Sequence, residues 1–244
     1  FTANALSFLA PLWVLLRYRG PRGHGGRAPR EDRRGRTREG LAYVWSRPQL
    51  RALVLLAAAT GVLFNASVLF PLLATRAFGL GGGGFGALLA SFGLGALPGA
   101  FIAARATGEP SGRLVRTLAL GTGISMCTTA YAAGPLVAFA TMAVTGFLSI
   151  WCIAAANTLA QLRCAPQMRG RVMGIWTMAL PGTAPLTSGV AAYIADHLGA
   201  RAGFAFAAAL LALAALTGWR AFVTPVRTTG AATDERQPSV PARA

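Results

Sequence analysis

The chain has 244 residues, is 54% hydrophobic and 12% charged, and its 23 basic residues, all of them arginine, give a net charge of +16. This composition excludes a monomeric water-soluble protein and favours a protein embedded in the lipid bilayer. The arginines lie in loops beside long apolar segments, without a basic-aromatic platform, so we expect no nucleic-acid partner.

The first predicted element, residues 1–16, is apolar and ends at Arg17 and Arg19, which indicates the end of a transmembrane helix. The chain opens without Met and without the basic start of a signal peptide. We therefore expect the sequence to be the C-terminal piece of a larger protein.

Residues 17–51 form a predicted cytoplasmic linker, which is rich in Gly, Pro and Arg at its beginning and should be flexible there. Its end is different, because Leu41, Val44 and Trp45 recur at helical spacing between arginines. This pattern predicts an interfacial helix over about residues 39–47 that stops at Pro48.

Six apolar segments then reach the length of about 20 residues that a hydrocarbon core about 30 Å thick requires. The sequence therefore predicts an all-α membrane protein whose residues 52–223 form a bundle of six complete transmembrane helices, followed by a disordered cytoplasmic tail at 224–244. The expected spans are 52–75, 85–104, 114–132, 136–162, 172–195 and 202–223.

The loops give this bundle an orientation. Of the 23 arginines, only Arg76 and Arg201 fall on one side of the predicted membrane, and the others fall on the opposite side. An excess of arginine in alternate loops marks the cytoplasmic side. We expect a multi-pass protein of the inner (cell) membrane with its C-terminus in the cytoplasm.

Polar and small residues inside the spans are the candidate functional positions. Asn65 is an amide in the middle of the first span, and either bonds a neighbouring helix or lines a cavity. Gly95 and Gly99 predict close helix packing in the second span. The fourth span contains polar residues spaced by multiples of four: Thr141, Thr145, Ser149, Asn157 and Gln161. Their hydroxyl groups either share a cavity face or bond back to their own helix.

The fifth span contains Pro181, Gly182 and Pro185, and each proline removes a backbone donor. We expect the helix to bend or open there, either as a structural kink or as a hinge next to a binding site.

Catalytic chemistry is not indicated. Cys127, Cys152 and Cys164 lack ligand or disulfide spacing, and every acidic residue lies outside the predicted hydrocarbon region. We expect no metal, no cofactor, no catalytic residue and no proton-relay carboxylate in these spans.

Two motifs carry a resemblance to a known family. The segment Glu39-Gly40-Leu41-Ala42-Tyr43-Val44 and the segment Pro166-Gln167-Met168-Arg169-Gly170-Arg171, preceded by Asn157 to Gln161, resemble the C-terminal half of a twelve-helix major facilitator superfamily transporter. Within it the chain is similar to bacterial drug and siderophore exporters, including macrolide-efflux and enterobactin-exporter relatives. The loop after the second span departs from the superfamily signature, because Ala103 and Ala104 stand where an acid is common.

The resemblance implies two inverted three-helix repeats and proton-coupled export of a small amphipathic or lipophilic molecule by alternating access against a missing N-terminal six-helix half. An importer of a small metabolite and a truncated, non-transporting membrane protein remain alternatives. Candidate cavity residues are Asn65, Thr141, Thr145, Ser149 and Trp151. Candidates for the cytoplasmic gate are Arg105, Arg113, Asn157, Gln161, Arg169 and Arg171.

Overall fold

The computed structural model describes residues 13, 17, 33–64 and 66–218. The chain divides into two compact units, Phe1–Arg38 and Glu39–Ala244, and the helices that position the candidate sites belong to the second. Several expectations lie outside the described residues: the first helix end apart from two positions, the flexible part of the linker, Asn65 and the C-terminal tail.

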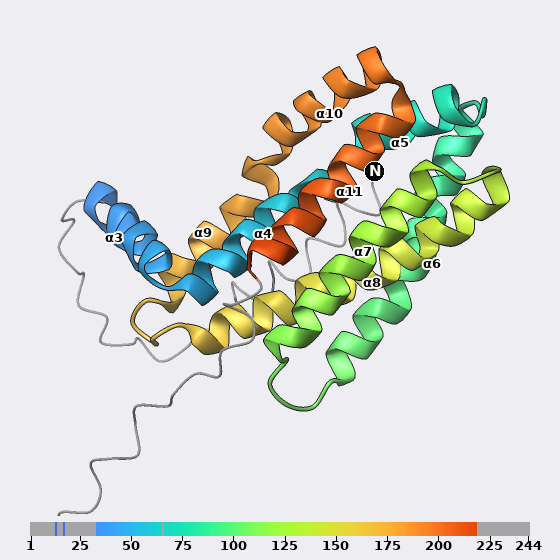
Figure 1. Ribbon diagram of the computed structural model, residues 1–244. Helices are drawn as coiled ribbons and strands as arrows, with labels where there is room; N and C mark the ends of the chain where they lie inside the picture. Colours follow the sequence, from blue (N-terminus) through green and yellow to red (C-terminus); the bar gives the residue numbers. More distant parts are fainter. Residues whose placement is uncertain (1–12, 14–16, 18–32, 65, 219–244) are drawn as a thin grey trace, which may run out of the picture. The chain divides into compact units, whose positions relative to one another are not determined.

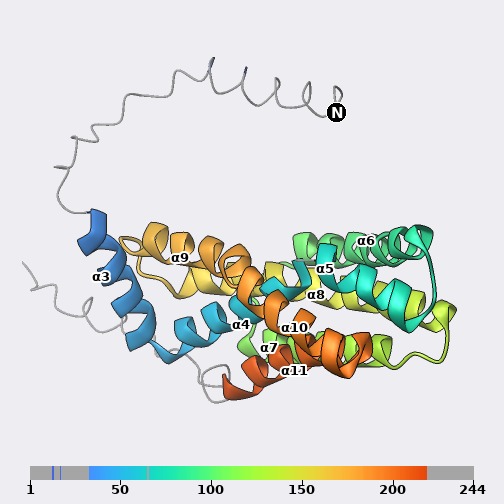
Figure 2. The same cartoon turned by 90° about the horizontal axis from the view of Figure 1, so that it is seen from above.

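The described residues are helical and contain no strand, as the sequence predicts. Figures 1 and 2 show the helices from two sides. They are α3 (Arg33–Ser46), α4 (Pro48–Phe64), α5 (Ala66–Leu72), the π-helical turn η1 (Leu73–Ala77), α6 (Gly82–Arg105), α7 (Gly112–Ala130), α8 (Pro135–Arg163), α9 (Arg169–Gly182), α10 (Ala184–Leu198) and α11 (Ala200–Thr217).

Local sequence explains where these helices begin and end. Pro48 and Pro135 are the first residues of α4 and α8, a position where proline's missing N–H costs nothing. The Ser111 hydroxyl caps α7 by accepting a hydrogen bond from the Leu114 amide at 3.1 Å. Gly199 has φ of +94° and allows the sharp reversal between α10 and α11. Pro48 therefore begins α4 directly after α3 has ended, and only one residue separates the two helices.

Among the described residues, three single helices are long and apolar enough to cross a membrane: α6, α8 and α11. The structure differs from the expectation at the other spans. α7 has 19 residues but is less apolar, because it carries Arg113, Arg116 and a row of hydroxyl side chains. The fifth expected span is divided between two helices, α9 and α10, and the first contains α4, α5 and the π-helical turn η1, with residue 65 outside the described residues.

Glycine brings α6 and α8 into backbone contact. A Cβ on Gly95 would overlap the Ala143 carbonyl group, and a Cβ on Gly99 would overlap that of Phe147. Gly146 of α8 approaches the Phe92 carbonyl oxygen of α6 in the same way. The tight packing predicted for Gly95 and Gly99 is thus confirmed, and the partner is α8 rather than the helix that follows in the chain.

The helix contacts repeat in two sets, α4–α7 and α8–α11. α8, the first helix of the second set, packs on α6 and α7 of the first set. α4, the first helix of the first set, packs on α9, α10 and α11 of the second set. α7 and α11 also pack on each other. Each set therefore completes the core of the other, which is the packing expected of two repeats.

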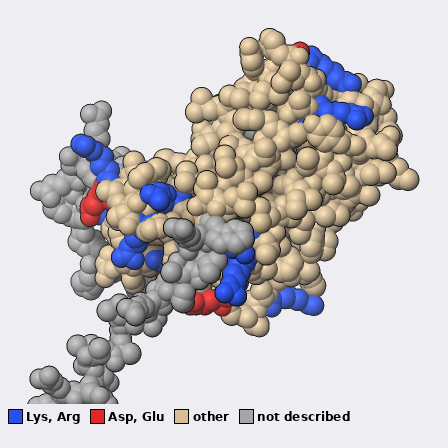
Figure 3. Space-filling model, in the orientation of Figure 1, with Lys and Arg blue, Asp and Glu red and all other residues tan. Residues whose placement is uncertain are grey.

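The described charges of the second unit lie at the helix ends, and Figure 3 shows an uncharged surface between them. Arg76 pairs with Asp196 at 2.5 Å, and this pair joins the end of η1 to the end of α10. Arg201, at the start of α11, lies 5.8 Å from the centre of the Phe78 ring. The end opposite this one carries eight further arginines: Arg47, Arg51, Arg105, Arg113, Arg116, Arg163, Arg169 and Arg171.

Candidate functional site

The helix break expected at Pro181 and Pro185 is present. α9 ends at Gly182, α10 begins at Ala184, and Thr183 is the residue between them. Proline at 185 cannot donate to the carbonyl four residues before it, so the backbone ladder is interrupted there. The Thr183 amide bonds the Pro181 carbonyl instead. Figure 1 shows α9 and α10 as two separate segments.

This break lies against α4. The Thr183 hydroxyl is 2.8 Å from the Ala58 carbonyl oxygen of α4 and 2.9 Å from the Ala179 carbonyl oxygen of its own helix, so one proton is shared between the two acceptors. A Cβ on Gly61 would overlap the Leu180 carbonyl oxygen and would lie 3.1 Å from the Thr183 hydroxyl. The glycine is therefore what lets α4 approach the break.

The span that contains α4 is irregular further along. α4 covers Pro48–Phe64 and α5 covers Ala66–Leu72, with Pro71 inside α5 and the π-helical turn η1 directly after it. The candidate residue Asn65, between them in the sequence, lies outside the described residues. The α9–α10 break thus lies against α4, before that span reaches Pro71 and η1.

A cavity of about 260 Å³ opens beside this contact, between α4, the α9–α10 junction and α11. The Thr183 and Thr187 hydroxyls are part of its wall. They already donate to backbone carbonyls, so a bound molecule need not supply hydrogen-bond acceptors for them. The rest of the wall is mostly apolar: Leu55, Ala58, Ala59, Leu210, Leu213, Ala214 and Thr217.

The predicted hydroxyl row of α8 has a different environment. Thr145 is fully buried and donates to Ser125 of α7 at 2.9 Å, and Ser125 in turn donates to the Thr141 carbonyl at 2.9 Å. Thr129 of α7 donates to the Thr141 hydroxyl at 2.8 Å. These four residues form a hydrogen-bonded seam between α7 and α8, called the hydroxyl seam below.

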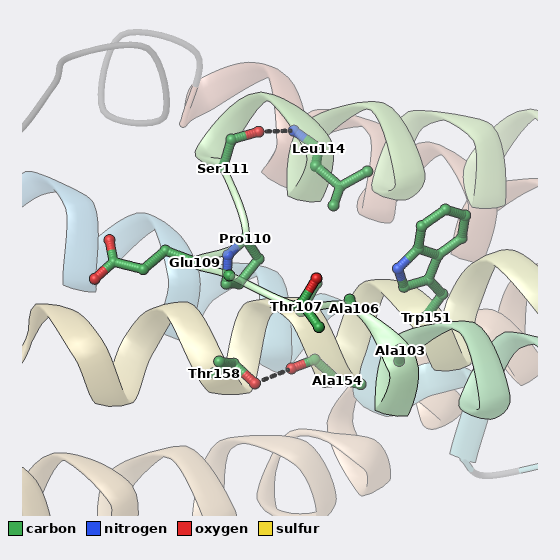
Figure 4. A pocket seen from close by; sticks show the side chains of 12 residues that line it. Ala103, Ala106, Thr107, Glu109, Pro110, Ser111, Leu114, Trp151, Ala154 and Thr158 are labelled. Atoms are coloured by element: carbon green, nitrogen blue, oxygen red, sulfur yellow. Dashed lines mark hydrogen bonds between the residues drawn. The ribbon is translucent and has the colours of Figure 1, made fainter.

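The remaining two cavity candidates, Ser149 and Trp151, have different surroundings. Ser149 is fully buried and donates to the Gly146 carbonyl of its own helix at 3.1 Å. Trp151 instead lines a second cavity, of about 320 Å³, between α8 and the loop that joins α6 to α7 (Figure 4). Thr107 and Glu109 of this loop also line the cavity together with several alanines, and the Glu109 carboxylate points away from Trp151 in Figure 4.

The gate candidates do not form one cluster. The Arg105 guanidinium stacks on the Phe101 ring at 3.9 Å, and Arg113 is exposed at the start of α7. Gln161 donates to Asn157 at 3.2 Å along one face of α8. Arg169 is exposed at the start of α9, and Arg171 pairs with Glu39 of α3 at 2.7 Å.

Sequence reasoning missed Ser125 and Thr129. A signal was available, because α7 and α8 form an antiparallel hairpin around residues 131–134. Ser125 and Thr129 have the same spacing of four as Thr141 and Thr145, and the two pairs lie at similar distances from the turn. Within the described residues, no group of three or more His, Cys, Asp or Glu side chains is arranged to hold a metal ion.

Comparison with known proteins identifies the family. A model of the transmembrane secretion effector family matches residues 1–242, which is almost the whole chain. Neither the curated proteins nor the solved structures gave a significant match. The chain therefore belongs to the transmembrane secretion effectors, a family of major facilitator superfamily membrane transporters.

Proposed function

We propose that this protein is a secondary active transporter that exports a small amphipathic or lipophilic molecule by alternating access. The observation that carries this proposal is the contact of an interrupted helix with its neighbour, in which Thr183 and Gly61 join the α9–α10 junction to α4. In membrane proteins, interrupted helices are tolerated where they are buried in protein or line a cavity, and in transporters they mark binding sites and hinges.

The chemistry of the walls supports an apolar cargo. The cavity next to the junction is lined mainly by leucine, alanine and threonine, and its hydroxyls already have backbone acceptors. A hydrophilic metabolite with a localised charge would need a matching charge inside the bundle. The described carboxylates lie elsewhere: Glu39 is in α3, which precedes the bundle, Glu109 is in the loop between α6 and α7, and Asp196 is near the end of α10.

Proton coupling is part of the proposal. Because no described carboxylate lies in the middle of a bundle helix, we place the proton-carrying group outside this bundle, in a second six-helix bundle against which this one rocks. Reading the gene upstream of the codon for Phe1 tests that part, since the remaining apolar spans of that bundle are expected there.

Among the residues selected from the sequence, Asn65 and Trp151 are our proposed substrate contacts. Thr141, Thr145 and Ser149 would join them only if α8 turns relative to α7, because their hydroxyls bond α7 or their own helix in this conformation. Replacing Asn65 with Leu should change which substrates are exported. Unchanged export of every compound tested would remove Asn65 from the path.

We further propose that the arginine-rich end faces the cytoplasm of a cell whose inner membrane holds the protein. Reporter tags inserted after Gly83 and after Gly112 should then report opposite compartments. Tags that report the same compartment would contradict this orientation.

Efflux of ethidium, a lipophilic cation, from cells that express the complete gene tests the proposed activity. Expressing cells should lose the dye faster than vector controls, and collapse of the proton gradient should abolish the difference. A matched pair, Thr183→Val and Thr187→Val, connects the activity to the junction, because only the Thr183 hydroxyl reaches α4. Equal efflux with and without the gene, over a panel of amphipathic dyes, would contradict export.

A further inference from the structure

The two family-like motifs of the sequence meet in space. Tyr43 of α3 accepts a hydrogen bond at its hydroxyl from the Ala165 amide, at 3.1 Å, and so contacts the turn between α8 and α9. Glu39, one turn earlier in α3, pairs with Arg171 in the first turn of α9 at 2.7 Å. Residues more than 100 positions apart in the sequence therefore tie α3 to the start of α9.

Gly40 makes this contact close. A Cβ at this position would lie 3.2 Å from the Arg171 Cβ and 3.4 Å from the Ile175 Cδ1, so a larger side chain would push α3 away from α9. Glycine inside a helix costs about 1 kcal/mol relative to alanine. The close approach of α3 to α9 therefore explains why glycine occupies position 40 despite this cost.

The same turn is also held from the start of α4. Arg163, the last residue of α8, donates to the Gln49 side chain at 2.7 Å. Between these contacts, the Arg47 guanidinium stacks on the Tyr43 ring at 4.5 Å, and Val44 is fully buried. α3 and the first turn of α4 thus both contact the α8–α9 turn, through Tyr43 before Arg47 in the sequence and through Gln49 after it.

The polar contacts of this attachment are weak. The Glu39 side chain is 61% exposed and that of Arg171 is 33% exposed, and an ion pair in such a setting contributes little to stability. A single neutral hydrogen bond such as that of Tyr43 contributes little more. The buried Val44 is the main apolar part of the attachment, and the polar contacts are weak enough to open and close during a conformational cycle.

We propose that residues 39–46 of α3 form a releasable strap that holds the start of α9, with Tyr43 and Gly40 as its positioning residues. The strap acts on the helix that is interrupted at Thr183, so its release frees α9 to move while α8 stays in place. This proposal rests on the proposed transport function for its role in the cycle, but the attachment itself does not depend on transport.

Cys164 reports whether the strap is attached. It lies next to Ala165, is 6% exposed, and donates to the Ala160 carbonyl at 2.9 Å. Burial raises the pKa of its thiol, and the nearby Arg169 and Arg47 oppose that rise. A buried thiol that is mostly protonated reacts slowly with maleimides. Detachment of α3 should therefore speed its modification.

The test is the rate at which N-ethylmaleimide modifies each cysteine of the full-length protein in membranes, read by mass spectrometry. Tyr43→Phe removes only the hydroxyl, and Cys164 should react about fivefold faster, the factor that corresponds to about 1 kcal/mol. Gly40→Leu should give a larger acceleration. Tyr131→Phe, which changes an exposed tyrosine at the end of α7, is the matched control and should have no effect.

Cys152, which is buried in α8, serves as the internal reference. Acceleration at Cys164 with an unchanged rate at Cys152 supports the strap. The proposal is overturned if Cys164 keeps its wild-type rate in both variants, or if Cys152 accelerates equally, since the substitutions would then only loosen the bundle.

A second arm separates the strap from the transport proposal. In energised membranes that export ethidium, wild-type Cys164 should react faster than in de-energised ones, whereas Tyr43→Phe should lose most of this difference. If no ethidium is exported, the export proposal fails for that compound, and the resting rates still decide whether α3 is a strap. Export without any change at Cys164 would show that the strap stays attached throughout the cycle, and would contradict release.

Discussion

Two of the helix pairs that make backbone contact through glycine differ in continuity. In the first pair, Gly95 and Gly146 bring α6 and α8 together, and the two helices run unbroken for 24 and 29 residues. In the second pair, Gly61 brings α4 against α9, and α9 ends after 14 residues at the junction with α10.

The difference shows that close packing and rigidity have separate causes in this protein. Glycine sets how near two helices come, whereas the combination of Pro181, Gly182 and Pro185 ends α9. A single proline does not have this effect, because α6 keeps its helix through Pro98. We therefore interpret α6 and α8 as the frame, and α9–α10 as the part that bends.

The largest expected effect is at the frame. Gly95→Leu forces a side chain into the Ala143 carbonyl group, and should destabilise the bundle by about 3 kcal/mol. Thermal unfolding in detergent measures this loss. Gly93→Leu is the control, because a Cβ there meets no atom within 4 Å, and it should remain close to wild type. Equal melting temperatures for the two variants would refute the backbone contact.

A smaller effect is expected where the second pair meets. Gly61→Ala adds one methyl group against the Leu180 carbonyl oxygen, and should cost about 2 kcal/mol because α9 can move away. Its unfolding should be compared with that of Gly174→Ala, a change on the open side of α9 that should cost nothing and should stabilise the helix by up to about 1 kcal/mol. A fully stable Gly61→Ala with normal efflux would show that α4 and α9 need not touch.

The hydroxyl seam adds to the frame. Ser125→Ala removes both the donor to Thr141 and the acceptor of Thr145, and should lower the free energy of unfolding by about 1 kcal/mol. Ser149→Ala removes only a bond within α8 and should have less effect. If the two changes cost the same, the seam does not join α7 to α8 more strongly than a hydroxyl joins its own helix.

The smallest expected effect on stability belongs to the junction. Thr183→Val removes the bond to Ala58 and should cost about 0.6 kcal/mol, the usual value for a hydrogen bond between membrane helices. Its effect on the rate of ethidium efflux should exceed that of Thr187→Val, because both keep the fold but only one releases α4. A larger loss of stability than of transport would assign Thr183 to the frame instead.

Sequence alone predicted the features that depend on neighbouring residues. The break at Pro181 and Pro185 follows from proline's missing donor, and the contact at Gly95 and Gly99 follows from small residues on one helical face. The helical class follows in the same way from long apolar segments separated by short loops.

What the sequence did not predict depends on which helices become neighbours. The spacing of Thr141, Thr145 and Ser149 defines a row on α8, but only the packing shows that the row faces α7 rather than an open cavity. The approach of Tyr43 to Ala165 likewise joins segments that no local pattern relates.

Amide hydrogen exchange of the full chain in lipid nanodiscs tests the division into frame and bending part most directly. The amides of Thr183 and Thr187 at the junction should exchange at least about tenfold faster than those of Ala143 and Phe147 in α8, because local opening is cheapest where the backbone ladder is interrupted. Equal protection at the two places would mean that the broken helices are as rigid as the frame, and would contradict the proposed hinge.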